Sequence, residues 1–496
     1  MSTSMTRREA LKLASLALVP RQVRRQGVKR VIVAGAGIGG LSCAWELMRR
    51  GHDVSVLEAS GRTGGHVFTF RDGLDDGLYA DGGAEHFTQP GYEKFWSYVR
   101  EFNLPFLYYP RREHLLRWID GRMYTPEMLA DRKVLGELGL NPREIEFLGQ
   151  HPFAELSSLY LGPYLDSFAD EYRPFDAGLN ALDQISSADL FRKDGASAGA
   201  LRFIGGRGSA LQAVWHAAIL KRRGVPLFPP KVFRLVGGNQ TLPDTFAARL
   251  GTRIKLQSPI TAIEHGPSGV RVNYLENGTP ARMEGDYLVC AMSARMLARL
   301  PVTPAWPADK GFAIGNVPYY HDTRVIFQSR SRFWERDSIS PNMQFGDTSL
   351  GSAWSASEEV KTARGLLAGT ASGAGTAERA LATYKKYYPG RSEDIEKANV
   401  VVWALDPWAS ACERTSYAPG QLAKFWPILI EPHGRSLRRR VRRQPELGDG
   451  GGDAFRESCG RGHSQIVNPA HFPESSGCPS GCVGSSAERT RTAVDD

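Results

Sequence analysis

The sequence has no run of apolar residues long enough to cross a bilayer, because none approaches 18 consecutive apolar positions. Cysteine is scarce, with six residues in 496, which excludes a disulfide scaffold. No group of histidines and cysteines has the spacing of metal ligands. Hydrophobic residues nevertheless make up 42% of the chain, so general disorder is excluded as well. The sequence therefore predicts a protein with a large buried core, no transmembrane segment and no metal site.

The net charge of +9 is unevenly distributed along the chain. Residues 1–30 hold eight lysines and arginines against one glutamate, so the remaining 466 residues carry a net charge of only +2. A groove for a phosphate backbone would need excess positive charge on the folded part of the protein. This distribution argues against a nucleic-acid partner.

The excess positive charge lies in an N-terminal segment that has the pattern of a targeting signal. Residues 6–12 read Thr-Arg-Arg-Glu-Ala-Leu-Lys and precede a short apolar stretch, 13–19. This pattern resembles a twin-arginine signal, which export machinery reads and which carries folded proteins to the periplasm. Because a small-x-small cleavage site is missing, a disordered basic tail on a cytoplasmic protein is the alternative. Under either hypothesis, residues 1–28 lie outside the fold.

The strongest motif is a glycine-rich turn between a predicted strand and a predicted helix. Residues 31–34 predict a buried parallel strand, residues 41–47 a helix, and residues 54–57 a second strand. Such a turn lets a diphosphate approach backbone amides at the positive end of a helix. An acid at the end of the second strand can accept hydrogen bonds from ribose hydroxyls. The residues predicted to bind a dinucleotide are Gly35, Gly37, Ile38, Gly39, Gly40 and Glu58.

The residues after Glu58 favour a flavin over a nicotinamide cofactor. Residues 58–65 read E-x-x-x-R-x-G-G, and Asp-Gly-Gly-Ala follows at 81–84. These motifs resemble the flavin-containing amine oxidase family, which includes monoamine, polyamine and L-amino acid oxidases. The resemblance implies an FAD cofactor held by Ala59, Arg62, Gly64 and Gly65, with Gly82 and Gly83 against the flavin. His66 stands where the family usually has an arginine.

Downstream segments extend the resemblance. Residues 254–263 and 269–272 predict two strands around a turn, and the family implies a backbone contact of Ile260 with the cofactor. Arg324 stands where the family has a lysine that holds a water near the flavin. Because an arginine stays protonated, Arg324 can hold a water or an anionic group but cannot act as a base. A surface arginine on a strand is the alternative interpretation.

Four residues are the candidates for the catalytic site: Arg324, Glu85, His86 and Glu413. Glu85 and His86 stand where L-amino acid oxidases usually have an arginine for the substrate carboxylate, which favours a cationic amine over an amino acid. A structural role of these two residues behind the site is the alternative. Glu413 takes the place of an aromatic residue of the family. Cys412 stands seven residues before Pro419, which resembles the spacing of the cysteine bonded to the flavin in monoamine oxidases. A buried or loop cysteine without that bond is the alternative.

The resemblance stops after Arg435. The family continues with a strand that ends in F-A-G-E and then a helix, whereas this chain has an arginine-rich run and a glycine-rich run at 448–453. Codons permitted for residues 438–441, read one base later, encode A-G-E-Y. We therefore hypothesise that residues 436–496 arise from a frameshift and form a disordered tail. A genuine basic tail, which would leave the flavin site incomplete, is the alternative.

These motifs predict an α/β fold, with an FAD-binding Rossmann-like domain and a discontinuous mixed α+β substrate domain. Residues 29–90, 225–295 and 422–435 are expected to form the first domain, and residues 91–224 and 296–421 the second.

The expected function is FAD-dependent oxidation of a C–N bond of an amine or amino acid to an imine, with O2 reduced to H2O2. One alternative is a flavin-dependent desaturase or isomerase acting on a C–C bond, which the missing lysine and aromatic residue favour. The other is an inactive flavoprotein-like chain, which the altered C-terminal region favours.

Overall fold

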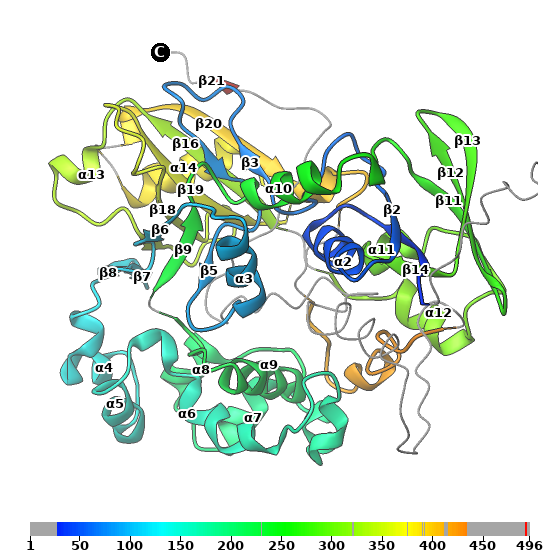
Figure 1. Cartoon of the computed structure of the whole chain (residues 1–496). Coiled ribbons are helices and arrows are strands. Elements are labelled where there is room, and N and C mark those ends of the chain that lie inside the picture. Colours follow the sequence, from blue (N-terminus) through cyan, green and yellow to red (C-terminus); the bar gives the residue numbers. More distant parts are fainter. Residues whose placement is uncertain are drawn as a thin grey trace, which may run out of the picture.

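A four-stranded parallel sheet supports the glycine-rich turn, at one side of the molecule (Figure 1). The computed structural model describes residues 27–433, except 230, 320, 321, 374, 389, 391 and 411–414, together with 492 and 493. The sheet has the order β10–β2–β1–β14 and consists of β1 (Arg30–Ala34), β2 (Asp53–Leu57), β10 (Ile254–Lys255) and β14 (Tyr287–Cys290). Residues 31–34 are fully buried, as expected for a strand covered on both faces.

Two helices cover one face of this sheet. α2 (Ile38–Arg49) follows the turn, and α10 (Thr241–Leu250) packs beside it. Leu41 of α2 and Phe246 of α10 are fully buried in one apolar cluster with Val33 of β1. Burying each such side chain contributes about 1.5–3 kcal/mol. The sheet therefore holds the N-terminal end of α2 in a fixed place.

A mixed sheet, antiparallel except for the parallel pairing of β11 with β15, extends from the parallel sheet at the outer side of the molecule (Figure 1). Its order is β13–β12–β11–β15, with β11 (Ile260–Gly266), β12 (Gly269–Glu276), β13 (Thr279–Gly285) and β15 (Val302–Thr303). The chain leaves β13 directly for β14, so the two sheets are joined by one short connection. β11 begins at Ile260, which lines the same cavity as the glycine-rich turn.

An eight-stranded sheet lies on the opposite side of the molecule (yellow strands in Figure 1). Its order is β21–β20–β16–β19–β18–β17–β7–β8, with β7 (Leu116–Ile119), β8 (Arg122–Tyr124), β16 (Asp322–Ser329), β17 (Met343–Gln344), β18 (Ser352–Ala356), β19 (Gly365–Ser372), β20 (Ile395–Val402) and β21 (Thr492–Ala493). Every residue of β16 is buried, because β16 has a strand on each side and packed layers on both faces. The sheet combines strands from residues 116–124 and 322–402, which are far apart in the sequence.

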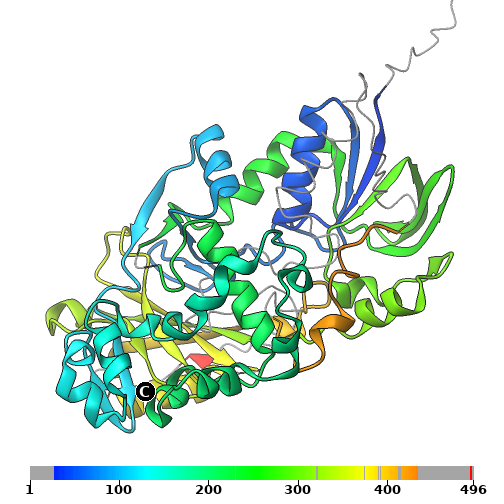
Figure 2. The same cartoon turned by 90° about the horizontal axis from the view of Figure 1, so that it is seen from below.

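Two small sheets connect these units. β3 (Thr69–Phe70) pairs with β4 (Ala80–Asp81), and β9 (Val232–Leu235) pairs with both β5 (Phe87–Thr88) and β6 (Phe106–Tyr109). The remaining helices are α3 (Glu93–Glu101), α4 (Arg132–Glu137), α5 (Pro142–Leu148), α6 (Ser158–Leu161), α7 (Ser187–Lys193), α8 (Ala198–Ile204), α9 (Ala210–Arg222), α11 (Ala294–Leu297), α12 (Ala308–Gly315), α13 (Phe333–Arg336) and α14 (Ala377–Tyr387). Seen from below, the helices of residues 132–222 lie in front of the yellow strands (Figure 2). None of the helices in the described ranges has the length and apolar character of a membrane span.

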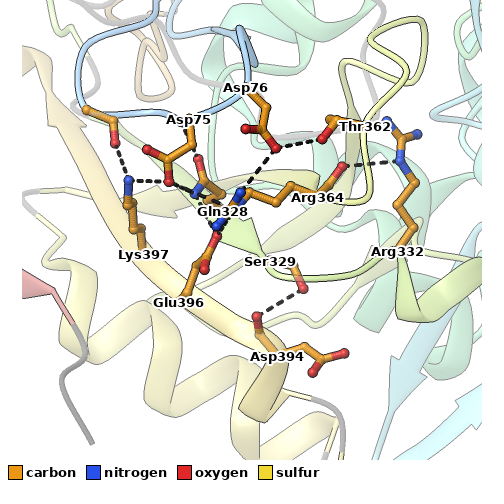
Figure 3. A network of polar contacts seen from close by, with 11 residues as sticks. Asp75, Asp76, Gln328, Ser329, Arg332, Thr362, Arg364, Asp394, Glu396 and Lys397 are labelled. Carbon is orange, nitrogen blue, oxygen red and sulfur yellow. Dashed lines mark hydrogen bonds and ion pairs between the residues drawn. The ribbon is translucent and has the colours of Figure 1, made fainter.

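A polar network joins the β3–β4 connection to the eight-stranded sheet (Figure 3). Asp75 accepts hydrogen bonds from Lys397 Nζ at 2.6 Å and from Gln328 Nε2 at 2.7 Å. Arg364 donates to Asp76 at 3.1 Å and to Glu396 at 2.6 Å. The chain runs from this connection through β4 to residues 82–86. The network therefore helps to position residues 82–86 against the eight-stranded sheet.

We expect Gly40→Ala to destabilise the protein by about 1–3 kcal/mol or more. A Cβ at Gly40 would overlap the Gly35 carbonyl oxygen and lie 3.1 Å from the Ala291 Cβ, so α2 would have to move away from β1. The free energy of unfolding in urea measures this cost. Gly39→Ala is the matched control, because a Cβ at Gly39 meets no heavy atom within 4 Å. Equal stability of the two variants would contradict this packing.

The polar network also predicts a pH dependence. Hydrogen bonds from Lys397 and Thr362, respectively, lower the pKa values of Asp75 and Asp76. Since the folded pKa lies below the unfolded value of about 3.9, the stabilisation is fully present above that value. It is lost as the pH falls through the folded pKa.

The double variant Asp75→Asn/Asp76→Asn should therefore lower the thermal midpoint at pH 7 and have less effect near pH 3. Thermal unfolding across this pH range measures the difference. Asp166→Asn, which removes a carboxylate from an exposed ion pair with Lys221, is the control and should not change the acid limb in the same way. A pH-independent effect of the double variant would contradict the assignment.

Candidate cofactor and active site

A cavity of about 240 Å³ lies above the parallel sheet. The β1–α2 turn forms its floor, and the segment after β2 forms one wall from Glu58 to Val67. Ile260 at the start of β11 and Ala84 after β4 bound it at separate positions. The cavity therefore meets the segments that the sequence predicts to bind a dinucleotide.

The glycine-rich turn presents backbone amides to this cavity. Gly35 adopts a φ of +109°, and its N–H donates to the Leu57 carbonyl oxygen at 2.8 Å, which ties the turn to the end of β2. Gly37 precedes α2, and no side chain caps the N-terminal N–H groups of that helix. The positive end of the helix macrodipole therefore faces a space without an acidic side chain in the first turn. This arrangement suits a diphosphate.

A second glycine segment crosses the turn closely. Gly64 N–H donates to the Ala36 carbonyl oxygen at 2.9 Å. A Cβ added to Gly65 would lie 3.1 Å from the Gly37 Cα. A Cβ at Gly64 would overlap the Val67 carbonyl oxygen, so this close crossing requires glycine at both positions. The two glycine segments together form a cradle of backbone atoms.

Glu58 fixes the turn through both of its carboxylate oxygens. Oε2 accepts a hydrogen bond from Ala36 N–H at 2.7 Å, and Oε1 accepts from Ser60 N–H at 2.8 Å and Ser60 Oγ at 2.7 Å. A carboxylate has about four lone-pair positions, so Glu58 keeps acceptor capacity toward the cavity. Ribose hydroxyls are donors of the kind that this capacity fits.

Arg62 and His66 differ in charge although both line the cavity. Arg62 donates to the Gly65 carbonyl oxygen at 2.9 Å and stacks on Phe68 with 4.9 Å between the guanidinium carbon and the ring centre. Burial lowers the pKa of Arg62 below its usual value, but nearby carboxylates act in the other direction. Desolvation lowers the pKa of His66 to about 4. His66 is therefore neutral near pH 7 and does not replace the charge of an arginine.

The loop after β20 closes the cavity on the side of His66. The Ala409 carbonyl oxygen lies 2.9 Å from His66 Nε2, and the Asp406 carboxylate accepts from Ala409 N–H at 2.6 Å. Asp406 and Trp408 line the cavity, and burial raises the pKa of the Asp406 carboxyl. The sequence did not predict a role for Asp406 and Trp408. It predicted Cys412 and Glu413, which lie further along the same loop.

The predicted cofactor residues divide into three groups. Ten line the cavity: Gly35, Gly37, Ile38, Gly39, Glu58, Ala59, Arg62, Gly64, Gly65 and Ile260. Gly40, Gly82 and Gly83 do not line the cavity. Gly40 packs α2 onto the turn, and Ala84 lines the cavity directly after the glycine pair. Cys412, like the catalytic candidate Glu413, lies outside the described residues. Residues that line the cavity without a sequence prediction include Ser60, Ser258, Met292, Ser293 and Arg299.

Three of the predicted catalytic residues meet in one buried cluster. Arg324 is fully buried on β16, which excludes the alternative of a surface arginine. Its Nη1 lies 3.1 Å from Glu85 Oε2, and Arg111 pairs with Glu85 Oε1. His86 Nδ1 lies 3.4 Å from the same Oε1 atom. The negative charge of Glu85 is therefore paired with two arginines inside the protein.

The residues of the cavity fit FAD. The cradle suits a diphosphate because glycines line the cavity at the N-terminal end of α2, where no side chain caps the backbone N–H groups. Glu58 offers acceptors for ribose, and one side of the lining is apolar, with Val289, Met292 and Leu300. In the described part of the chain, no group of His, Cys, Asp and Glu side chains could hold a metal ion.

Comparison with known proteins places this geometry in a family. The profile of the family described as flavin containing amine oxidoreductase matches residues 38–437. The L-amino-acid oxidase of Pseudechis australis is 24% identical over 437 residues, which is 83% of this chain and 82% of that protein. The L-amino-acid oxidase of Demansia vestigiata is 28% identical over 63% of this chain and 60% of that protein.

Solved structures share the fold. Cyclohexylamine oxidase from Brevibacterium oxydans IH-35A superposes with a TM-score of 0.67 at 22% identity, covering 82% of this chain and 92% of that one. Wild-type putrescine oxidase bound to putrescine has a TM-score of 0.66 at 21% identity with the same coverage. Because the family profile spans most of the sequence, the chain belongs to the flavin containing amine oxidoreductase family and is an FAD-dependent amine oxidase.

Proposed function

We propose that this oxidase acts on a small amine or amino acid and uses O2 as the final electron acceptor. The substrate loses two electrons and two protons to become an imine, and O2 takes them up to become H2O2. Water then splits the imine into a carbonyl compound and ammonia. The observation that carries the proposal is the cavity that reaches from Glu58 and the glycine cradle to Ala84, beside the buried cluster of Glu85 and Arg324.

Bound FAD supplies the two-electron redox chemistry, and the protein supplies binding, orientation and a dry site. The glycine cradle and Glu58 would hold the diphosphate and a ribose. Arg62 would add positive charge near the diphosphate, whereas the neutral His66 would contribute only a hydrogen bond within the protein. Arg324 stays protonated, so it would orient neighbouring groups rather than remove a proton.

Burial around Arg324 excludes water from that side of the site. Trp354 and Trp403 are each at most 2% exposed, and Trp354 lies against two guanidinium groups. An enclosed site keeps a substrate nitrogen in its neutral form and protects the imine from early hydrolysis. The roles of Glu413 and Cys412 in this site stay predictions from the sequence.

We expect the FAD-loaded enzyme to release H2O2 and ammonia in equal amounts with at least one class of primary amine. A peroxidase-coupled assay and an ammonia assay, run on aliphatic monoamines, diamines and L-amino acids, measure both products. Peroxide without ammonia would favour the alternative reaction on a C–C bond. Release of neither product by an enzyme with a full complement of FAD would contradict the proposed function.

We propose further that residues 436–496 result from a frameshift. Two observations support this: the match to the family profile ends at residue 437, and residues 438–441 are compatible with codons that, read one base later, would encode A-G-E. Residues 434–491 lie outside the described residues. We also propose that Arg7 and Arg8, which are outside the described residues as well, belong to a twin-arginine export signal.

Sequencing the gene across codons 430–470 should reveal a one-base difference that restores F-A-G-E. A chain with the restored frame should then retain more FAD through purification than the printed chain, because the missing segment contacts the cofactor in the family. The ratio of flavin absorbance to protein measures retention. A gene sequence that confirms the printed frame would contradict the frameshift. Full FAD retention by the printed chain would contradict the expectation that the missing segment is needed to hold FAD.

A further inference from the structure

Glu85 lies immediately behind the wall of the FAD cavity. Ala84 lines the cavity, and the next side chain, Glu85, is only 2% exposed. Its two carboxylate oxygens have different partners: Oε1 pairs with Arg111 and Oε2 lies 3.1 Å from Arg324 Nη1. A carboxylate this deeply buried is costly unless it is paired, so these two partners are required for its charge.

The two arginines come from separate parts of the fold and share an aromatic neighbour. Arg324 lies on β16 in the middle of the eight-stranded sheet, and Arg111 follows β6. Their guanidinium carbons lie 5.2 Å and 3.8 Å, respectively, from the Trp354 ring centre. Glu85 therefore links three segments that the sequence separates widely.

Arg324 also holds the backbone of the cavity wall. Its Nη2 donates to the Gly83 carbonyl oxygen at 2.9 Å. The adjacent Ala84 N–H donates to the His66 carbonyl oxygen at 3.0 Å, and the Ala84 carbonyl oxygen accepts from Asn239 Nδ2 at 3.0 Å. Backbone and amide contacts thus fix the wall at Ala84, and Arg324 fixes it from the protein interior at Gly83.

The direction of FAD along the cavity follows from the chemistry of its ends. Glu58 suits the ribose of the adenosine half, and the glycine cradle suits the diphosphate. The redox-active ring must therefore extend away from Glu58, toward the part of the cavity bounded by His66, Val67 and Ala84. The charge of Arg324 lies behind that part of the wall.

We propose that Glu85 is a positioning residue for the cofactor ring: through Arg324 it fixes the Gly83–Ala84 wall, and it offsets one of the two positive charges behind that wall. The inference rests on the binding of FAD in this cavity. Glu85 would then affect both the position of the ring and the electrostatic potential around it. The second consequence has a distinctive sign, because an uncompensated positive charge favours the reduced, more negative ring.

The test is Glu85→Gln in the FAD-loaded enzyme. We expect a higher midpoint potential of the bound cofactor, a changed visible absorption spectrum, and kcat lowered roughly 10- to 100-fold with a smaller change in KM. Glu171→Gln is the matched control, because Glu171 pairs with Arg223 at 2.7 Å in a half-buried ion pair remote from the cavity lining. It should lower the thermal midpoint and leave the potential and spectrum unchanged.

A second variant keeps the test decisive if Glu85→Gln alone does not fold. Glu85→Gln/Arg111→Met removes one buried cation together with the carboxylate, so the three-residue group keeps its net charge of +1. The potential of this double variant should therefore change less than that of Glu85→Gln, whereas the spectrum and kcat should still change because Arg324 loses the carboxylate that orients it. A folded variant with wild-type potential, spectrum and kcat overturns the proposal. Failure of both variants to fold overturns it too, because Glu85 would then be purely structural. Failure of the wild-type enzyme to bind FAD would instead contradict the proposed function.

Discussion

The site depends on a crossing of two backbone segments that carry no side chains. Gly37 at the start of α2 and the Gly64–Gly65 pair approach so closely that a single added Cβ would enter the space between them. Ala36 is bonded on both sides, through its N–H to Glu58 and through its carbonyl oxygen to Gly64. This crossing aligns the end of a helix, an acceptor for ribose and a cradle for a diphosphate in one rigid unit.

Two groups of charged residues, one partly exposed and one buried, then connect this unit to the eight-stranded sheet. The network around Asp75 and Arg364 is half exposed, so each of its ion pairs contributes little to stability and is weakened by salt (Figure 3). The group around Glu85 and Arg324 is buried, so loss of one partner leaves an unpaired charge at a cost of several kcal/mol. The outer network guides the segment after β3 to the sheet, and the inner group fixes its final position.

Local patterns in the sequence predicted the parts of the fold that are local in space. The strand–turn–helix–strand unit of residues 30–57 follows from an apolar run, glycines and helical periodicity, and Glu58 lies at the end of the second strand as expected. The pairing of Glu85 with Arg111 had no such signal. That pairing, together with the pairing of Glu85 with Arg324 on β16, requires the segments after β4 and β6 to meet β16 through tertiary contacts, which no periodicity encodes. The position of Asp406 in the cavity depends in the same way on the path of the loop after β20.

The central claim is that FAD lies in the cavity with its diphosphate at the glycine cradle and its ring toward Ala84. An experimental structure of the chain with FAD tests this most directly. The account predicts continuous density from Glu58 past Gly37 and Gly65 to Ala84, with the ring in front of the wall held by Arg324. Density for the cofactor elsewhere, or a cradle filled by protein side chains, would contradict it.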